Sequence, residues 1–510
     1  MSADEQSGLG QLSVFEGGFT LEAADAVLEL AELWPEDAVQ ALVDKSLVRV
    51  VAEDRFDLLV SVQEYAAEKL AASGGRSDAE ARHGAHFATV GTEDALEALD
   101  RHGGGPLRRA LTRELDNLVA ASRRAVVRRH GEVAANTALA AWKVLQLTGP
   151  LATAHAVLAA AGSVATGPSE RLRVTYAHGR ARHRAGQMDE AGAHYEAALA
   201  VAREVANRRS EGVALGALGE WHADQGRLDE ARAHVEAALA VAREGGNRRL
   251  EGAMLMDLGN LHASQGRLDA SRAHYEAALA VARDLGHRRL EGSVLGNLGH
   301  LLTEQGQLAD AYAHVEAALT VARLAGSRRG EGYWLVSLGR LDAERGRMDE
   351  SCAHVEAALA VARDLGDRRL EGIVLGQLGS LNAELGRMDQ AHIRYHEALA
   401  AARDLGDPGL EGAVLGGLGR LHADQGELDE ALAFLTEGEP LLRGAGKRLE
   451  LGLLLCSRAR LDHGEGDLPA AQSALAEAEA LLSSLGAGPD SPLGRALTEA
   501  RAVVGVRQPQ

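Results

Sequence analysis

The segment nearest in type to a phosphate-binding loop is Gly444-Ala445-Gly446-Lys447-Arg448. A P-loop carries a further glycine, separated by four residues from the Gly-Lys pair, and a Ser or Thr after the lysine that reaches the magnesium ion. Leu441 and Arg448 occupy those two positions. No apolar strand precedes the segment, so the sequence predicts a plain turn between two helices.

Histidine recurs every 40 residues, at His194, His234, His274, His314 and His354. Ligands of one metal ion must lie within ~2 Å of it, whereas packed helices lie ~8–10 Å apart. Equivalent histidines of successive copies therefore cannot share an ion, and we expect them on the flank of a helix. No Ser/His/Asp, Cys/His or paired-carboxylate set stands out either. We expect no catalytic residue, metal or cofactor, and no enzymatic activity.

A pair of arginines also recurs, first as Arg208-Arg209 and then from 248, 288, 328 and 368. Glu211 and its copies lie three residues after the first arginine of each pair. A carboxylate at a helix start is favoured by the helix dipole, and exposed ion pairs contribute at most ~1 kcal/mol. We expect a solvated edge, with a phosphate-binding strip as the alternative.

Two positions vary among copies that are otherwise almost identical. They hold Ala217, Asp257, Asn297, Ser337, Gln377 and Gly417, and three residues later Glu220, Asn260, His300, Arg340, Ser380 and Arg420. Residues three apart share one face of a helix. Either a solvated face has drifted, or these side chains line a groove that grips an extended peptide, with an adjacent aromatic pair as anchor. The candidate partner-binding residues are Asp257, Asn260, Asn297, His300, Tyr333, Trp334, Ser337, Arg340, Gln377, Ser380 and Arg420.

The elements that position these residues follow from the repeat itself. Glu-Gly recurs at 211, 251, 291, 331, 371 and 411, and glycine marks eight copies at 186, 226, 266, 306, 346, 386, 426 and 466. Each copy reads as two helices, helix A over about 211–224 and helix B over about 228–243. Leucines in helix A, such as Leu215 and Leu218, form rows that are buried only when neighbouring copies stack. A fixed period of this size predicts a stacked helical array.

The array resembles the tetratricopeptide repeat, in its 40-residue variety. Leu218-Gly219, Gly226, Ala231, Val235 and Ala238 correspond to that family's signature positions, and the resemblance covers about 171–480. It implies an all-α, right-handed solenoid of about eight helix pairs, over 169–490, whose helices A line a concave groove. The sequence departs from the pattern near its end. The run 437–440, with Pro440, replaces the usual end of helix B, and 466–469 puts Pro469 where the last copy should continue. The last copy is expected to serve as a polar cap. A C-terminal helix and tail would follow over 491–510.

The first 168 residues differ from the repeats. The segments 12–27, 41–50 and 55–74 form a connected set, in which 47–51 and 56–60 alternate as a hairpin around Glu53-Asp54. This set resembles the winged-helix segment of bacterial STAND signalling ATPases, and 81–90 and 114–126 resemble their helical connector. The resemblance implies a winged-helix-like domain over 1–72 and a connector over 73–168. That family's nucleotide-binding domain would precede residue 12, so this protein is a remnant, its switch domain lies on another chain, or the true start lies upstream.

Composition restricts the partners. The net charge of −20 among 510 residues argues against general affinity for nucleic acids or anionic membranes. Before the hairpin, Glu36, Asp37 and Asp44 outweigh Lys45, which argues against DNA reading by the winged helix. Seven arginines crowd the connector but are interrupted by Glu114, so we expect connector surface or an acidic partner contact: Arg108, Arg109, Arg113, Arg123, Arg124, Arg128 and Arg129.

No signal peptide or membrane span is apparent, which predicts a cytoplasmic protein. The sequence therefore favours a protein–protein interaction module, a regulatory sensor or adaptor that binds a protein or peptide in the concave groove. A small-molecule ligand is not indicated. The alternatives are a transcription regulator that uses the winged helix on DNA, and a fragment or subunit of a STAND ATPase.

Overall fold

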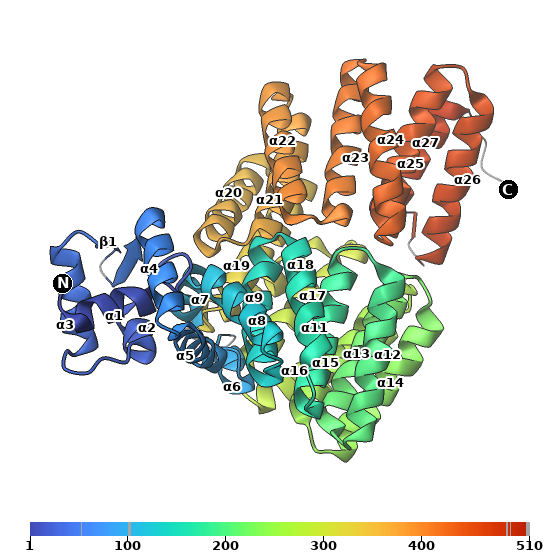
Figure 1. The fold of residues 1–510 in the computed structure, drawn as a ribbon. Coiled ribbons are helices and arrows are strands. Elements are labelled where there is room, and N and C mark those ends of the chain that lie inside the picture. Colours follow the sequence, from blue (N-terminus) through green and yellow to red (C-terminus); the bar gives the residue numbers. More distant parts are fainter. Residues whose placement is uncertain (53, 100–103, 486–487, 490, 506–510) are drawn as a thin grey trace. The chain divides into compact units, whose positions relative to one another are not determined.

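The structure is a computed structural model that describes residues 1–52, 54–99, 104–485, 488–489 and 491–505 (Figure 1). The described chain is almost entirely helical, with one two-stranded hairpin. It divides into two compact units, each described by itself. Unit 1 comprises 1–146 and 152–178, and unit 2 comprises 147–151 and 179–510.

Unit 1 begins with three short helices and the hairpin. The hairpin strands pair antiparallel, with Val48 opposite Leu58. Phe15 and Phe19 stack at 5.0 Å between ring centroids and are almost fully buried, as is Leu12. The hairpin expected from the alternating pattern is therefore present; Glu53, at its tip, lies outside the described residues. The elements are α1 (Ala3–Leu12), α2 (Leu21–Val27), α3 (Pro35–Asp44), β1 (Val48–Ala52), β2 (Arg55–Leu58) and α4 (Val60–Ala72).

The rest of unit 1 is helical, and two of its helices, α9 and α11, continue into unit 2. Helices α5 and α8 pack on each other, and α5 also packs on α2. The region after the hairpin is thereby tied to the N-terminal helices. The elements are α5 (Arg76–Thr89), α6 (Glu93–Ala98), α7 (Gly104–Arg113), α8 (Leu115–Val127), α9 (Gly131–Thr148), α10 (Leu151–Val164) and α11 (Pro168–Arg184).

Unit 2 is a stack of helix pairs in which each helix packs on its predecessor. The helices A are α13 (Arg208–Asp224), α15 (Arg248–Ser264), α17 (Arg288–Glu304), α19 (Arg328–Glu344), α21 (Arg368–Glu384), α23 (Pro408–Gln425) and α25 (Arg448–Gly464). The helices B are α12 (Met188–Glu204), α14 (Leu228–Glu244), α16 (Leu268–Asp284), α18 (Leu308–Leu324), α20 (Met348–Leu365), α22 (Met388–Leu405), α24 (Leu428–Gly444) and α26 (Leu468–Ser484), and α27 (Pro492–Val504) follows. The all-α solenoid expected from the repeat is confirmed.

Helices A begin three residues earlier than the repeat pattern predicted, at Arg208 rather than Glu211. The cause is a side-chain cap. The Asn207 carboxamide oxygen accepts a hydrogen bond from the Ser210 backbone amide at 3.1 Å, and the Asp367 carboxylate accepts one from Leu370. Such caps satisfy amides that the first helical turn leaves without partners.

The predicted core rows are buried. Leu338 and Leu418 are at most 1% exposed, and the equivalent leucines of the other copies are likewise buried. Within each pair, helix A approaches helix B closely at one glycine. A Cβ added at Gly219 would lie 2.5 Å from Val235 Cγ2, closer than carbon atoms can approach. Glycine at this position therefore sets the packing of helix A on helix B.

The C-terminal end differs from the prediction in three respects. Helix α24 runs through Pro440 to Gly444, so the run 437–440 does not replace the usual end of this helix B. Pro469 lies in the first turn of α26, where its missing amide hydrogen removes no helical bond. The last helix pair is not a polar cap, because α27 covers it with Leu493 and Leu497, which are at most 1% exposed.

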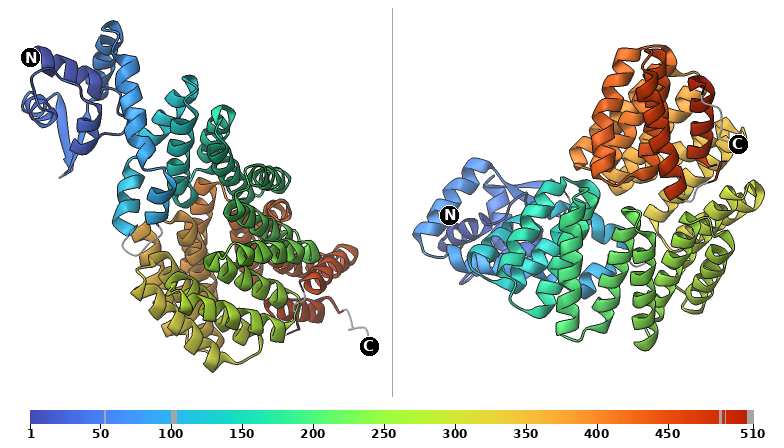
Figure 2. Two further views of the ribbon diagram at one scale, coloured as in Figure 1. Left: turned by 90° about the horizontal axis from the view of Figure 1, so that it is seen from below. Right: turned by 90° about the vertical axis from the view of Figure 1, so that its right-hand side faces the viewer.

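The array of unit 2 bends back on itself (Figure 2). A Cβ added at Gly186, before α12, would lie 3.2 Å from the Ala445 Cα, in the turn after α24. At the end of α11, burial and the positive charges of Arg369 and Arg329 lower the pKa of Arg184 to about 10. Arg369 and Arg329 lie on α21 and α19, so the amino-terminal ends of these helices A lie near the end of α11.

No helix in the described part of the chain combines the length and apolar character needed to cross a bilayer.

Candidate functional site

Hydrogen bonds join the variable positions of α15, α17 and α19, and separately those of α21 and α23, in a polar row. On α15 the exposed Asn260 accepts at its side-chain oxygen from Asn297 Nδ2 of α17, at 2.9 Å. The same oxygen accepts from the Tyr275 hydroxyl of helix B, at 2.7 Å. Two candidate residues that are 37 positions apart in the sequence are thus in contact. We call the face formed by the candidate residues of α15, α17, α19, α21 and α23 the groove row.

The row continues through His300. Arg340 Nη2 lies 2.7 Å from His300 Nδ1, and His300 Nε2 lies 3.4 Å from Ser337 Oγ. Burial and the neighbouring Arg340 lower the pKa of His300 to about 4, so the imidazole is neutral near pH 7. Its Nδ1 then accepts from Arg340, its Nε2 donates to Ser337, and the Ser337 hydroxyl donates to the Tyr333 carbonyl at 3.1 Å. The orientation of each side chain is fixed by the next.

At its far end the row reaches α23. Arg420 Nη2 donates to Ser380 Oγ at 3.2 Å, and Ser380 Oγ lies 2.8 Å from the Tyr395 hydroxyl. Gln377 lies one turn before Ser380, and its buried Oε1 accepts no hydrogen bond from any described residue. At the near end, Asp257 is half-buried on α15. The surrounding protein and the Glu220 carboxylate raise its pKa to about 7.

The two aromatic candidates are placed differently from the rest. A Cβ added at Gly296 would lie 2.1 Å from Trp334 Cη2, so the indole occupies the space that this glycine leaves on α17. The equivalent positions in other copies, such as Val294 and Val374, are fully buried. Packing between helices therefore accounts for Trp334, whether or not its half-buried ring also contacts a partner. Tyr333 lies under the Arg329 guanidinium, 5.8 Å from its ring centroid.

The paired arginines form an arrangement that the sequence did not predict. Glu211 is only 7% exposed, and its two carboxylate oxygens accept from Arg203 Nε at 3.0 Å and from Arg208 Nη1 at 2.7 Å. The predicted solvated edge is right for the arginines and wrong for the glutamate, which the two arginines cover. We call this arrangement the arginine clamp. It recurs with both arginines on Glu251, Glu331 and Glu371, and with the helix B arginine on Glu291 and Glu411.

Electrostatics agrees with the clamp geometry. The hydrogen bond from Arg203, with a further one from Arg208, holds the pKa of Glu211 below its ordinary value despite its burial. The first arginine also reaches the next helix B, as in Arg248 to Asp284 at 3.5 Å. A signal for the clamp was present in the sequence, because the Arg–Glu spacings of eight and three residues recur with the copies.

The histidine row lies on helix B flanks, as expected, but with different neighbours in different copies. His234 stacks on His222 of helix A with ring centroids 4.9 Å apart, and His274 stacks on His262 at 5.0 Å. His354 Nδ1 instead lies 2.8 Å from the buried Asp342 carboxylate. The segment that resembled a phosphate loop is the turn between α24 and α25, also as expected.

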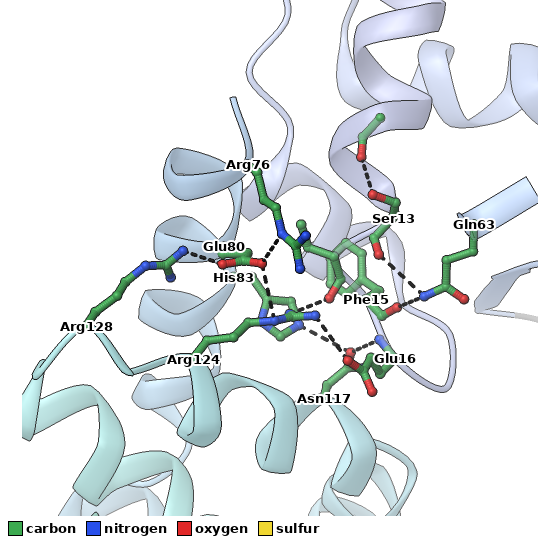
Figure 3. A network of polar contacts seen from close by, with 12 residues as sticks. Ser13, Phe15, Glu16, Gln63, Arg76, Glu80, His83, Asn117, Arg124 and Arg128 are labelled. Atoms are coloured by element: carbon green, nitrogen blue, oxygen red, sulfur yellow. Dashed lines mark hydrogen bonds and ion pairs between the residues drawn. The ribbon is translucent and has the colours of Figure 1, made fainter. Parts of the chain in front are cut away.

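Unit 1 contains a polar network that ties its N-terminal loop to α5 and α8 (Figure 3). The Asn117 side-chain oxygen accepts from the Glu16 amide at 2.7 Å, and Arg124 Nη1 donates to the Val14 carbonyl at 2.6 Å. Buried His83 lies 3.3 Å from the same Asn117 oxygen, and burial lowers its pKa to about 3. Arg124 was expected on the connector surface, and this expectation is wrong, because the residue holds the loop instead.

Glu80 accepts from Arg76 Nε at 2.8 Å and also pairs with Arg128 (Figure 3). This part of the network is internal to the connector helices. Arg76 lies only one helical turn before Glu80, whereas Arg128 lies 48 residues after it, so a local pattern could have indicated only the first of these pairs. The charged groups are paired with one another, which describes a structural network rather than a reaction centre, and the buried His83 Nδ1 forms no hydrogen bond with a described residue.

Comparison with known families finds the tetratricopeptide repeat at residues 170–244, 250–324, 331–404 and 374–444, together just over half of the chain. A search of curated proteins found no match. Solved structures with a similar fold include BtubC from P. vanneervenii (19% identity, 42% of this chain and 90% of that one, TM-score 0.37). Another is a STAND protein with a tetratricopeptide repeat sensor from Pyrococcus horikoshii (14% identity, 95% of this chain and 65% of that one, TM-score 0.42).

A third is the Rap conjugation gene regulator of plasmid pLS20, solved in complex with the Phr* peptide (15% identity, 66% of this chain and 97% of that one, TM-score 0.46). At these identities the likeness concerns the fold alone. The repeat family, in contrast, matches directly in the sequence, at the residues that form the helix pairs of unit 2. The chain therefore belongs to the tetratricopeptide repeat family.

Proposed function

We propose that this protein is a regulatory sensor or adaptor, and that it binds an extended segment of a partner protein along the groove row. The observation that carries the proposal is the row itself. Polar side chains of five successive helices A share one face of the array, hydrogen bonds link those of α15, α17 and α19 and those of α21 and α23, and the residues differ from copy to copy. A purely structural row would repeat, as the arginine clamp does.

The spacing of the row suits an extended chain. Neighbouring helices lie ~8–10 Å apart, and an extended peptide advances ~3.3–3.6 Å per residue. About every third residue of a bound segment would then face a new helix A. The row offers amide, hydroxyl, imidazole and guanidinium groups, which can pair with both the backbone and the side chains of such a segment.

The likeness of unit 1 to the winged-helix and connector segments of STAND proteins supports the regulatory part of the proposal. The hairpin β1–β2 and the flanking helices have the expected order. The carboxylates Glu36 and Asp37 at the start of α3 disfavour DNA as the partner of this segment. In this proposal unit 1 contacts protein, not nucleic acid.

The proposed role is binding without catalysis. Lys447, the lysine of the segment that resembled a phosphate loop, lies in the turn before α25 and does not follow a strand. We therefore expect neither ATP nor GTP to bind in isothermal titration calorimetry. Tight nucleotide binding that is lost in Lys447→Ala would contradict this part of the proposal.

The main test uses a partner recovered by pull-down with the full chain. Changing Asn297, His300 and Arg340 to alanine should weaken binding by ~2–4 kcal/mol, the range for a few interface anchors. The matched control changes Arg208 and Arg248, which belong to the arginine clamp on the other edge of the same kind of helix. Unchanged affinity in the triple variant, or an equal loss in the control, would place the site elsewhere.

A further inference from the structure

The two ends of the groove row differ in charge. The end formed by α15 holds Asp257, and the exposed Glu220 lies on the preceding helix A, α13. Glu220 pairs with Arg180. For Asp257, the described residues supply neither a hydrogen-bond donor nor an ion pair within contact distance. One carboxylate at this end is therefore neutralised and the other is not.

Asp257 lies in an environment that does not favour a free carboxylate. Its side chain is half-buried on α15, and the surrounding protein and Glu220 raise its pKa to about 7, although the charge of Arg180, beyond ion-pair distance, acts in the opposite direction. A cation placed beside it would favour the ionised form and lower that pKa. The residue is thus suited to an amine or guanidinium group from a bound molecule.

At the far end the unpaired charges are positive. Arg340 and Arg420 are both exposed, and their bonded partners are the neutral His300 and the Ser380 hydroxyl. No described carboxylate forms an ion pair with either guanidinium, although Glu344 follows Arg340 by one helical turn. The clamp arginines, by contrast, are each paired with glutamate. Nearby Arg329 and Arg369 are paired too, with Asp367 at 2.9 Å and Asp407 at 2.7 Å.

Arg340 and Arg420 lie on α19 and α23, with α21 between them. Asp257, on α15, is two helices A away from Arg340 and four away from Arg420. At ~8–10 Å per helix and ~3.3–3.6 Å per residue, these intervals correspond to about 5 and about 11 residues of extended chain. The opposite charges are therefore far enough apart for one peptide to meet both with different side chains.

We propose that the groove row binds an extended peptide in one fixed orientation, with a Lys, Arg or amino-terminal amine at Asp257 and carboxylates at Arg340 and Arg420. This inference rests on the proposed function and adds the chemistry and the direction of the ligand. A chain of net charge −20 would repel an acidic peptide at long range. The local pairing at α19 and α23 would overcome that repulsion only for a ligand that places its carboxylates there.

The test is selection from a displayed library of random 16-residue peptides with the full chain as bait. We expect enriched peptides to carry Lys or Arg about 5 to 11 positions from Asp or Glu. Asp257→Asn should remove the enrichment of the basic residue and keep the acidic one. Arg340→Gln with Arg420→Gln should do the reverse, and Arg323→Gln with Arg363→Gln, two clamp arginines, should change neither.

An enriched peptide then allows a double-mutant cycle by fluorescence anisotropy. Replacing its basic residue by Gln should couple about tenfold to Asp257→Asn and not to the arginine pair, since close charge pairs across an interface are coupled and distant ones are not. Enrichment without this charge pattern, or without coupling, would overturn the inference and leave peptide binding intact. Enrichment that the Asn297, His300 and Arg340 triple variant does not reduce, or no enrichment at all, would instead contradict the proposed function.

Discussion

The helices A of unit 2 carry polar residues on two sides, and the two sides differ in how they vary. The arginine clamp recurs in successive copies, and four of its glutamates are at most 8% exposed. The groove row changes residue from each copy to the next, and Arg340 and Arg420 are exposed to solvent. The contrast teaches that burial alone does not fix a residue in this array, because Ser337 of the groove row is as buried as the clamp glutamates and still differs from its equivalents. The clamp and core contacts between neighbouring copies repeat, whereas the hydrogen bonds of the groove row join neighbouring copies through different residues.

The largest effect should come from the core row of α19. Leu338→Ala removes a side chain that is 1% exposed, and large-to-small changes at such sites cost about 3 kcal/mol. Its matched control, Arg340→Ala, lies two residues further on the same helix and should stay within ~0.5 kcal/mol. Urea denaturation followed by circular dichroism measures both. Equal losses would mean that the groove row is part of the fold.

The clamp should contribute less than the core and more than the groove. Glu211→Gln leaves Arg203 without a charge partner, while Arg208 keeps Glu244 of the next helix B. We expect this to cost about 1 kcal/mol, since hydrogen bonds to charged groups stabilise by ~1.5–3 kcal/mol and solvent screens the half-exposed arginines. Glu220→Gln, on the groove side of the same helix, is the control and should change the unfolding midpoint hardly at all. A larger loss in Glu220→Gln would reverse the assignment of the two sides.

The arginine clamp also predicts how the stability of the fold depends on pH. Because the pKa of Glu211 is lower in the folded chain than its ordinary value, the carboxylate stabilises the fold above about pH 4.5 and loses that contribution as the pH falls through the folded pKa. We expect the melting temperatures of the wild type and Glu211→Gln to converge between pH 5 and pH 3. A difference that stays constant over this range would show that the carboxylate is not held as the clamp geometry implies.

The titration of His300 tests the hydrogen bonds of the groove row, and we expect it to change the free energy of unfolding very little. Its imidazole should titrate near pH 4, followed by the Hε1 chemical shift in NMR. Arg340→Gln removes the adjacent positive charge and should raise the pKa of His300, although burial, the larger cause, will keep it below the ordinary 6.5. A titration near pH 6.5 in the wild type would mean that the chain from Arg340 to Ser337 does not form.

The sequence predicted the repeat architecture because the array depends on local spacing. Leu215 and Leu218 recur with the period, and burial of their rows follows from stacking alone. The start of helix A was misplaced because the Glu-Gly marker was read as its first turn, whereas the capping side chain lies four residues earlier and recurs with the period, as at Asn207, Asn247 and Asp367. The clamp was missed because each exposed pair was weighed alone, whereas Arg203 comes from the preceding helix and helps to cover Glu211.

The candidate site, like the fold, was predicted from the sequence only in part. The sequence placed Asn260, Asn297 and Arg340 on one face, because residues three apart and 40 apart must align in a stack. The bond between Arg340 and His300 depends on how far neighbouring helices are offset, which spacing does not give. The sequence could not show that Trp334 packs between helices, because its indole fills the space beside Gly296, a glycine on another helix.

The most direct test of the account measures affinity and stability together in one variant, with Asn297, His300 and Arg340 changed to alanine. The account predicts weaker binding of the recovered partner by ~2–4 kcal/mol. It also predicts a change in the free energy of unfolding of no more than ~0.5 kcal/mol per substitution. Unchanged affinity, or a loss of affinity matched by a loss of folding, would contradict the claim that the varying side of helices A binds while the constant side holds the array.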